Sequence, residues 1–236
     1  PLYKSVERRV ADYFRGELRD LQAVLADSTP ATVSDKLEAV IDERQNELRR
    51  LLESVTTGIA NRFAGHTYDK LNGKKSRAEI DPWSTYITSW ISNNAAEKVT
   101  QITDTTREQI RETLAEGVAA GEHIRELASR IDALYLTQII PNRSQTIART
   151  EVLAASNLGS QAGAQATGLP LKKSWLSTPD ARTRQTHSMA NGQEVGINEP
   201  YYVGGSALMF PGDSSLGADA GEIVNCRCTE TYRVAR

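Results

Sequence analysis

Apolar residues recur at steps of three and four through most of the first 168 residues, and this spacing limits the fold more than any other feature. Such steps place apolar side chains on one face of a helix, because a helical turn takes ~3.6 residues. Charged side chains, Glu17 among them, fall on the opposite face of the first segment. A Ser-Thr-Pro run ends this helix near residue 27, since proline disfavours helix at the residue before it. The predicted apolar face comprises Val6, Val10, Phe14, Leu18, Leu21 and Leu25.

A second helix is predicted from Ser34 to Phe63. Two long helices joined by a short turn favour a helical hairpin or a coiled-coil-like arm, and a plain helical bundle is the alternative. Glycines and a proline predict a loop over residues 65–82. A small basic cluster in this loop is interpreted as solvated, with contact to DNA or an acidic partner as the alternative. The cluster consists of Lys70, Lys74, Lys75 and Arg77.

Further helices follow up to the glycine at position 168. Thr105 with Glu108 three residues later forms a capping-box pattern, which predicts that one helix ends near Ile102 and a new one starts here. A short helix over residues 124–134 comes next, and a longer one starts at Asn142 or Ser144. The later part of this last helix is rich in Ala, Ser and Gly, so we expect it to pack closely against its neighbours.

The pattern changes after residue 171, where segments shorten and turn-forming residues appear every few positions. Polar and apolar residues alternate over 173–176 and 227–234, as they do in half-buried strands. Asn191-Gly192 predicts a hairpin turn, because both residues tolerate positive φ. We therefore expect an α+β fold, with an elongated N-terminal helical arm, a helical body and a small, mostly-β C-terminal module. The predicted divisions are 1–98 (helical arm or hairpin, and docking region), 99–168 (helical lead-in) and 169–236 (the C-terminal module).

Charge and hydropathy exclude several classes of protein. The net charge is −2, so any contact with nucleic acid has to be local. No apolar run approaches the ~20 residues that a membrane-spanning helix needs, so no membrane contact is expected. The chain begins with Pro1 rather than Met, which suggests a trimmed or partial product. Its two cysteines, one residue apart, do not make a disulfide framework and favour a reducing compartment.

The two cysteines and one histidine are candidate metal ligands. Cys226 and Cys228 fall in a predicted strand, whose alternation places both thiols on one side and the intervening arginine on the other. With His187 they give three ligands, and Asp180 or Asp213 is a candidate fourth. The cysteine spacing differs from the usual zinc pattern, so we expect no cofactor and keep zinc as the alternative. Burial of the thiols as small hydrophobic groups is the simpler interpretation.

The same histidine has a catalytic interpretation. His187 with Asp180 and a cysteine thiolate gives a nucleophilic triad, since imidazole titrates near neutral pH. No oxyanion-hole glycine motif accompanies these residues. A structural histidine beside a salt-bridged turn of Asp180, Arg182 and Arg184 is the alternative.

Residues of the preceding helix complete the predicted cluster. Arg149 and Glu151 form either an exposed ion pair or a link that ties their helix to the turn at residues 180–184. We expect the whole set to be structural rather than catalytic. The predicted structural cluster consists of Arg149, Glu151, Asp180, Arg182, Arg184, His187, Asn225, Cys226 and Cys228.

The order of several short motifs resembles the phage Mu F-like minor head protein family, whose members are also called phage head-morphogenesis proteins. The resemblance covers roughly residues 100–232, whereas residues 1–98 carry no motif of the family. The motifs are Ile147–Glu151, Asp180–Arg184 followed by His187, Asn191-Gly192 and Asn225–Cys228, after a helical lead-in with Ile102–Thr106, Glu116-Gly117 and Gly121.

This resemblance implies a non-enzymatic component of the virion. Members of the family are minor capsid proteins at the portal vertex or capsid interior, which act in head assembly and in packaging or delivery of DNA. The implied partners are the portal protein and the major capsid or scaffold protein, with packaged DNA as a further one. The implied location is the virion, and the host cytoplasm during assembly. Two other classes stay open: a nuclease- or transferase-like enzyme that uses Asp180, Arg184 and His187, and a zinc-stabilised nucleic-acid-binding module.

Overall fold

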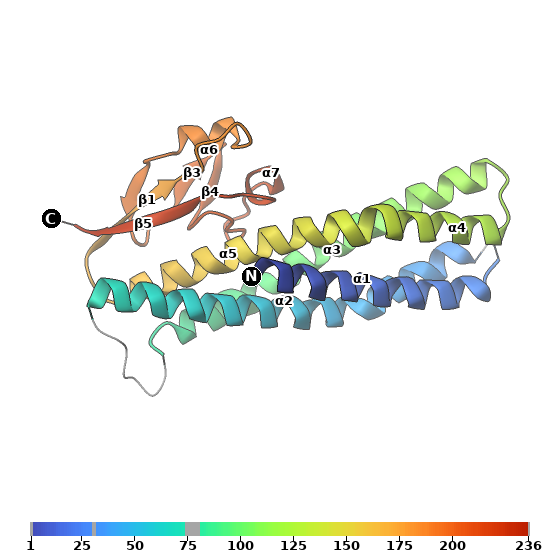
Figure 1. Cartoon of the computed structure of the whole chain (residues 1–236), viewed down its shortest axis with the longest axis horizontal. Helices are drawn as coiled ribbons and strands as arrows, with labels where there is room; N and C mark the ends of the chain where they lie inside the picture. The colour runs from blue at the N-terminus through green and yellow to red at the C-terminus, as the bar shows by residue number, and fades with distance from the viewer. Residues whose placement is uncertain (1, 30–31, 74–80, 236) are drawn as a thin grey trace. The chain divides into compact units, whose positions relative to one another are not determined.

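The computed structural model describes residues 2–29, 32–73 and 81–235 (Figure 1). The predicted α+β class is confirmed, because helices form most of the described chain and an antiparallel sheet follows them in the sequence. No helix in these ranges has the length and apolar character needed to cross a bilayer. The helices before the sheet are α1 (Leu2–Ala26), α2 (Val33–Asn72), α3 (Ser84–Ala119), α4 (Ile124–Leu134), the π-helix η1 (Tyr135–Arg143) and α5 (Ser144–Ala166).

The chain forms two compact units, and each is built from two separate segments. Unit 1 contains residues 1–52 and 95–148, and unit 2 contains residues 53–94 and 149–236. The helices α2, α3 and α5 therefore contribute residues to both units. Because each unit is formed by two segments that are distant in the sequence, neither unit corresponds to one continuous stretch of the chain.

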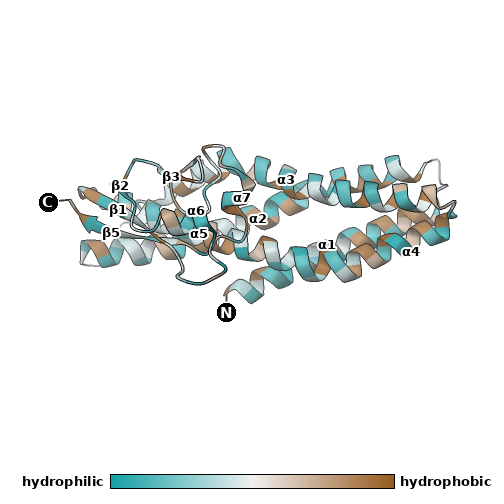
Figure 2. Ribbon diagram, turned by 90° about the horizontal axis from the view of Figure 1, so that it is seen from above, coloured by the Kyte–Doolittle hydropathy of each residue, from teal (hydrophilic) through white to brown (hydrophobic). Residues whose placement is uncertain are grey.

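The apolar stripe of α1 faces the interior of unit 1, and its predicted positions from Val6 to Leu25 are buried. Figure 2 shows hydrophobic and hydrophilic residues alternating along α1 and α4, as expected for helices with one buried face. The prediction that Glu17 lies on the charged face is wrong, because this residue is only 1% exposed. Its carboxyl group accepts hydrogen bonds from the hydroxyls of Tyr13 (2.8 Å) and Tyr135 (2.7 Å), which explains how this polar group is accommodated in the core.

The π-helix η1 joins α4 directly to α5 and carries Pro141 inside it. Proline lacks an N–H group and normally ends an α-helix, and a wider π turn is one way to accommodate it. The helix α5 begins at Ser144, which is one of its two predicted starts. At the end of η1, Arg143 donates hydrogen bonds to three acceptors on α3, among them Thr106 Oγ1 at 2.7 Å. These bonds fix η1 against α3 within unit 1.

Two predicted helix boundaries are wrong. The helix α3 continues through Thr105, whose hydroxyl donates to the carbonyl of Gln101 at 2.9 Å instead of capping a new helix. Threonine makes this bond inside a helix when its neighbours keep the helix intact. The helix α2 extends to Asn72, so the first part of the predicted loop at 65–82 is helical. Most of the predicted basic cluster lies outside the described residues, namely Lys74, Lys75 and Arg77.

Unit 2 contains a three-stranded antiparallel sheet with the order β2–β1–β5 and a two-stranded ribbon of β3 and β4 (Figures 1 and 2). The central strand β1 alternates buried and more exposed residues, and its register places Trp175 opposite Glu230. The strands predicted at residues 173–176 and 227–234 are found as β1 and β5, except that β5 begins only at Thr229. The elements are β1 (Leu171–Leu176), α6 (Gln185–Met189), β2 (Glu194–Gly196), β3 (Tyr201–Val203), β4 (Ser206–Leu208), α7 (Ala220–Ile223) and β5 (Thr229–Val234).

The turn at Asn191-Gly192 follows α6 and leads into β2, so it does not join two strands directly. Gly192 has a φ of 80°, which glycine adopts without steric cost. Its N–H donates to the carbonyl of Trp175 (2.8 Å), and the side-chain oxygen of Asn191 accepts from the N–H of Ser177 (3.0 Å). The predicted turn is present, but the predicted simple hairpin is wrong because α6 lies between the paired strands.

Within unit 2, α5 approaches α2 closely at two glycines. A Cβ atom added to Gly159 would lie 2.2 Å from the backbone oxygen of Ala60, and one on Gly163 would lie 2.2 Å from that of Ala64. Only glycine permits such an approach of one backbone to another. This contact confirms the predicted close packing of the small residues in the later part of α5.

Candidate functional site

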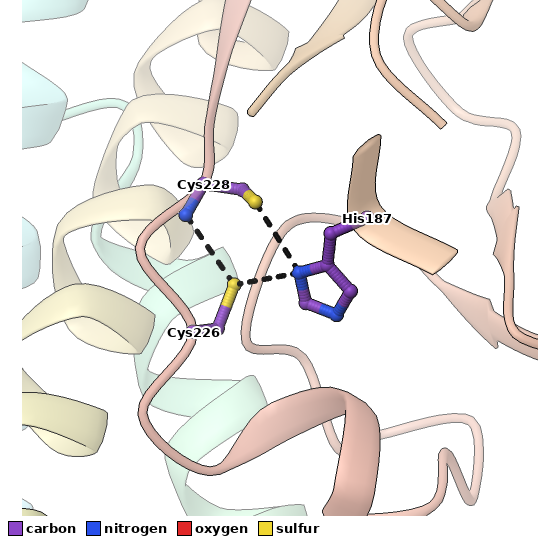
Figure 3. Close-up of side chains that lie close together, drawn as sticks. All are labelled: His187, Cys226 and Cys228. Carbon is purple, nitrogen blue, oxygen red and sulfur yellow. Dashed lines mark hydrogen bonds between the residues drawn. The ribbon is translucent and has the colours of Figure 1, made fainter. Parts of the chain in front are cut away.

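Three side chains from separate parts of the C-terminal module meet in its buried interior (Figure 3). His187 comes from α6, and Cys226 and Cys228 come from the loop between α7 and β5. His187 Nδ1 lies 3.3 Å from Cys228 Sγ and 3.6 Å from Cys226 Sγ. The three candidate ligand atoms are within 4.8 Å of one another, and no residue of the group is more than 2% exposed. The structure thus brings together the three residues that the sequence offers as metal ligands.

The loop that carries the cysteines is shaped by a turn. The prediction that both cysteines lie in a strand is wrong, because β5 begins only at Thr229. Asn225 adopts the left-handed conformation (φ 56°), which asparagine tolerates better than most residues. Its N–H donates to Thr150 Oγ1 of α5 (3.0 Å), and the N–H of Cys228 points to Cys226 Sγ (3.4 Å). This turn, rather than strand alternation, directs both thiols to one side.

The second ring nitrogen of His187 faces a carboxylate. His187 Nε2 lies 2.9 Å from Glu222 Oε2, although the direction of this approach is not that of a hydrogen bond. Glu222 also accepts a hydrogen bond from Thr186 Oγ1 (2.8 Å), and the ring of Trp175 meets the imidazole edge-on at 5.6 Å between centroids. Sequence reasoning missed Glu222. Its signal was the spacing from Asp219, the N-cap of α7, which matches a capping box.

The two thiols differ in acidity because they share a hydrogen bond. This bond from Cys226 lowers the pKa of Cys228 well below the usual thiol range, and the neighbouring His187 lowers it further. The same pairing, together with burial, raises the pKa of Cys226. A thiolate is the form of cysteine that binds metals or attacks electrophiles.

The turn before α6 is organised by Asp180. Its carboxylate accepts two hydrogen bonds of 2.5 Å from the Arg227 guanidinium and one of 2.9 Å from the N–H of Arg182. The largely exposed guanidinium of Arg182 lies 3.6 Å from the same carboxylate. The Arg227 guanidinium holds the pKa of Asp180 well below its usual range. Arg184 has a different partner, the carbonyl oxygen of Val224.

The catalytic grouping of Asp180, Arg184 and His187 is not assembled by these contacts. Asp180 binds Arg227, Arg184 binds a backbone carbonyl, and His187 faces the two thiols. The carboxylate next to the imidazole belongs to Glu222. In addition, His187 is only 2% exposed, so a substrate has no open approach to a nucleophile beside it.

Two residues of the predicted cluster lie on α5, where Arg149 is exposed and Glu151 is buried. Thr150, between them, accepts the hydrogen bond from the N–H of Asn225. This residue joins α5 to the cysteine loop. A link from Arg149 and Glu151 to the turn at residues 180–184 stays a prediction.

The two proposed fourth ligands are engaged elsewhere. Asp213 accepts hydrogen bonds from the N–H of Met209 (2.9 Å), from the N–H of Ser215 (3.0 Å) and from the indole of Trp90 (3.3 Å). Asp180 is held by its arginine partner. Neither aspartate belongs to the group of candidate ligand atoms. The chain therefore offers three ligands, not four, among the residues that the structure describes.

A second polar cluster in the module was missed by sequence reasoning. Lys173 on β1 is fully buried, donates to the carbonyl of Met209 (2.5 Å) and lies 5.0 Å from the ring centroid of Tyr201. Glu230 on β5 accepts from the hydroxyls of Tyr201 (3.2 Å) and Tyr232 (2.5 Å). Burial lowers the pKa of Lys173 and raises that of Glu230 to about 7. Charged residues in an alternating strand normally face water, so the sequence carries no sign of this cluster.

Comparison with known proteins gives three relatives and one family. The NAD(+)--arginine ADP-ribosyltransferase EFV of Enterococcus faecalis is 31% identical over 53% of this chain and 26% of its own length. The uncharacterized protein YqbB of Bacillus subtilis is 28% identical over 52% of this chain and 40% of its own length. The minor head protein GP7 of Bacillus phage SPP1 is 28% identical over 50% of this chain and 38% of its own length. No solved structure matches.

A family model described as "Phage Mu protein F like protein" matches residues 108–231, which is more than half of the chain. The class defined by these matches is that of proteins that contain this family's domain. The chain belongs to the phage Mu protein F like family, and the resemblance seen in the sequence is confirmed. The matched part spans less than half of each relative named above.

Proposed function

We propose that this chain is a minor head protein of a bacteriophage that acts in head assembly and in packaging or delivery of DNA, without catalysing a reaction. The observation that carries the proposal is the family match over residues 108–231. The relative named minor head protein GP7 supports it. The cluster around His187 supports a non-enzymatic role, because its members are buried and bound to one another.

The proposed partners are the portal protein and the major capsid or scaffold protein, with packaged DNA as a further one. The proposed location is the portal vertex or the capsid interior of the virion, and the host cytoplasm during assembly. All of residues 1–98 lies outside the family match, which starts at residue 108. Partner-specific contacts are expected in such a segment, because each phage has its own portal and capsid surfaces.

The ADP-ribosyltransferase relative raises the enzymatic alternative. The match covers only 26% of that protein, so its named activity does not have to lie in the shared segment. The residues nominated for catalysis here have separate partners, as described above. We therefore keep the structural role as the proposal.

A co-purification experiment tests the docking role of the N-terminal helices. Deleting residues 1–64 would also remove the buried stripe of α1, so surface substitutions are the sharper test. Arg49 and Arg50 are exposed on α2, and Met189 and Tyr202 are exposed at 78% and 66% in the C-terminal module. The full chain is co-expressed with the tagged portal protein of the same phage, as wild type, as Arg49→Glu/Arg50→Glu and as Met189→Ser/Tyr202→Ser.

We expect the wild type and the module variant to be retained on the portal, and the helix variant to be retained several-fold less. Circular dichroism of each purified chain shows whether it is folded. If only the Met189/Tyr202 variant loses retention, the docking surface lies on the C-terminal module and not on the N-terminal helices. A wild-type chain that does not associate with portal, capsid or scaffold protein would contradict the proposal.

A further inference from the structure

We propose that His187, Cys226 and Cys228 bind one zinc ion, with a water molecule as the fourth ligand. The site would join α6 to the loop before β5, two segments about 40 residues apart in the sequence. This inference does not depend on the proposed role in the phage head. It concerns the stability of the module that the family match covers.

The distances from the imidazole nitrogen to the two sulfur atoms fit a tetrahedral ion. Zinc binds sulfur at about 2.3 Å and nitrogen at about 2.0–2.1 Å, and a tetrahedral angle then places the nitrogen about 3.5 Å from each sulfur. The observed distances from His187 Nδ1 are 3.3 Å to Cys228 Sγ and 3.6 Å to Cys226 Sγ. Figure 3 shows one ring nitrogen facing both sulfur atoms. These two distances are compatible with a zinc ion bound by the nitrogen and both sulfur atoms.

Charge balance favours a divalent cation at this buried position. Cys226 and Cys228 as thiolates carry two negative charges, which a buried site cannot hold without compensation. A zinc ion with two thiolates and a neutral imidazole is uncharged overall. Such a complex is compatible with the apolar core around it, where Trp175, Tyr201 and Leu208 pack against the cysteines.

The surroundings of His187 also fit a metal-bound imidazole. A histidine that binds metal through one nitrogen usually presents the other to a carboxylate, a carbonyl or water, which orients the ring. Here Nε2 of His187 is 2.9 Å from Glu222 Oε2, and Thr186 Oγ1 holds the same oxygen at 2.8 Å. The N–H of Cys228 points to Cys226 Sγ at 3.4 Å, where it stabilises negative charge on that sulfur. Glu222 is thus a positioning residue, not a ligand.

A purely hydrophobic role and a disulfide both account less well for the cluster. Thiols that serve only as small hydrophobic groups account for burial of Cys226 and Cys228 but not for the imidazole aimed between them. A disulfide between them would close a ring across a single residue and would be strained. The backbone at Asn225 and the hydrogen bond to Thr150 already hold the loop in place without a covalent bridge.

Metal analysis of the full chain tests the proposal. The wild type is refolded with reductant and zinc, dialysed and analysed for zinc by mass spectrometry. The cysteine variants Cys226→Ser and Cys228→Ser are treated in the same way, and His66→Ala serves as the matched control because His66 is exposed and outside the cluster. We expect about one zinc per chain in the wild type and the control, and a loss of at least ten-fold in each cysteine variant.

A second measurement keeps the test valid if a cysteine variant fails to fold. Cobalt(II) is added to the wild-type apoprotein under reducing conditions, and the absorption spectrum is recorded. Tetrahedral ligand-field bands with thiolate-to-cobalt charge transfer are expected, and zinc should remove them by displacement. The conservative variant Glu222→Gln should keep the same spectrum with an affinity about 10–100-fold lower, as when a group that orients a metal ligand is changed in other proteins.

Several results would overturn the zinc site. One is a wild-type chain that retains well below one equivalent of zinc after refolding in its presence. Another is a cobalt spectrum without thiolate charge transfer. Zinc content that stays at one equivalent in both cysteine variants would place the ion elsewhere in the chain and would also refute the assignment.

Discussion

At the scale of single residues, Glu17 shows how the core of unit 1 accommodates a carboxyl group. Burial raises the pKa of Glu17, while hydrogen bonds from Tyr135 and Tyr13 oppose the rise. The positive charges of Arg44 and Arg143 also oppose it. Because burial has the larger effect, the neutral carboxyl group is favoured in the folded chain relative to the unfolded one.

This shift predicts a pH dependence of stability. The stabilisation from neutral Glu17 is fully present below the unfolded pKa of about 4.3. It is lost as the pH rises toward the higher folded value, because the unfolded chain then releases its proton first. Glu17→Gln keeps an acceptor for the two tyrosines and cannot ionise. The free energy of unfolding of this variant, relative to wild type, should therefore increase between about pH 4 and pH 8.

Urea unfolding followed by far-UV circular dichroism measures this difference. Glu112→Gln is the matched control, because Glu112 is exposed on α3 in the same unit. This control removes a carboxyl group from an exposed position, so a pH dependence seen only in the Glu17 variant is assigned to burial. If the Glu17 variant follows a curve parallel to wild type, the buried carboxyl group does not titrate as described.

The residues of the candidate site differ in how far the sequence could reveal them. His187, Cys226 and Cys228 could be selected because their side chains are rare here and chemically distinctive. Glu222 fits a helix-capping pattern in the sequence, but its place beside His187 depends on how α7 packs against α6. Lys173 was hidden for the same reason: its lysine side chain is read as exposed until tertiary contacts bury it. Residue type identifies the candidates, but only the fold selects their partners.

At the scale of elements, periodicity predicts helices well and their ends poorly. The apolar stripe of α1 is found where the spacing places it, because burying that stripe dominates its stability. The helix end predicted at Thr105 is absent, since a capping pattern contributes only ~1 kcal/mol and packing along α3 outweighs it. The strand predicted at Cys226 begins only at Thr229, because the left-handed turn at Asn225 cannot be read from alternation.

The contact between α5 and α2 gives an element-scale prediction. Gly159→Ala places a methyl group where the backbone of Ala60 lies, so the helices have to separate. We expect a loss of about 1–3 kcal/mol in the free energy of unfolding, as for other overpacked cores. Gly58→Ala on α2 is the control, because no atom lies within 4 Å of the added carbon. There the change should stabilise the helix by roughly 0.5–1 kcal/mol.

Tryptophan fluorescence is the appropriate probe for both glycine variants. The chain has three tryptophans, Trp83, Trp90 and Trp175, and all belong to unit 2. Urea unfolding followed by their emission therefore reports on the unit that contains the contact. Equal effects of the two substitutions would show that helix propensity alone is being measured and that the close approach is absent.

At the scale of the whole molecule, the family match and the compact units follow different boundaries. The match covers residues 108–231, whereas unit 2 combines residues 53–94 with 149–236. The division into 1–98, 99–168 and 169–236 stays a prediction about domains. Sequence patterns indicate where elements change type, and they do not show which distant helices complete the core of a module. This is why the class of fold could be predicted and the composition of the units could not.

The C-terminal module depends on α5 for its buried polar groups. Asn157 donates to the carbonyls of Pro211 (2.8 Å) and Cys228 (3.1 Å), and Gln161 donates to that of Ile197 (2.6 Å). Without these donors, the three carbonyls would lose their partners at a cost of about 1–3 kcal/mol each. A sequence fragment that starts after α5 removes both side chains at once.

We therefore predict that residues 169–236 do not fold when expressed alone, although they contain the three proposed zinc ligands. The fragment should show poorly dispersed amide signals in NMR spectra and no cooperative unfolding, because it lacks α5 and the tryptophan of α3 that binds Asp213. The control is the full chain with a protease site inserted at Gly168, cut after folding. Its two pieces should stay together in gel filtration, since the contacts with α5 need no peptide bond. If the fragment folds alone, α5 packs against this module but is not required for it to fold.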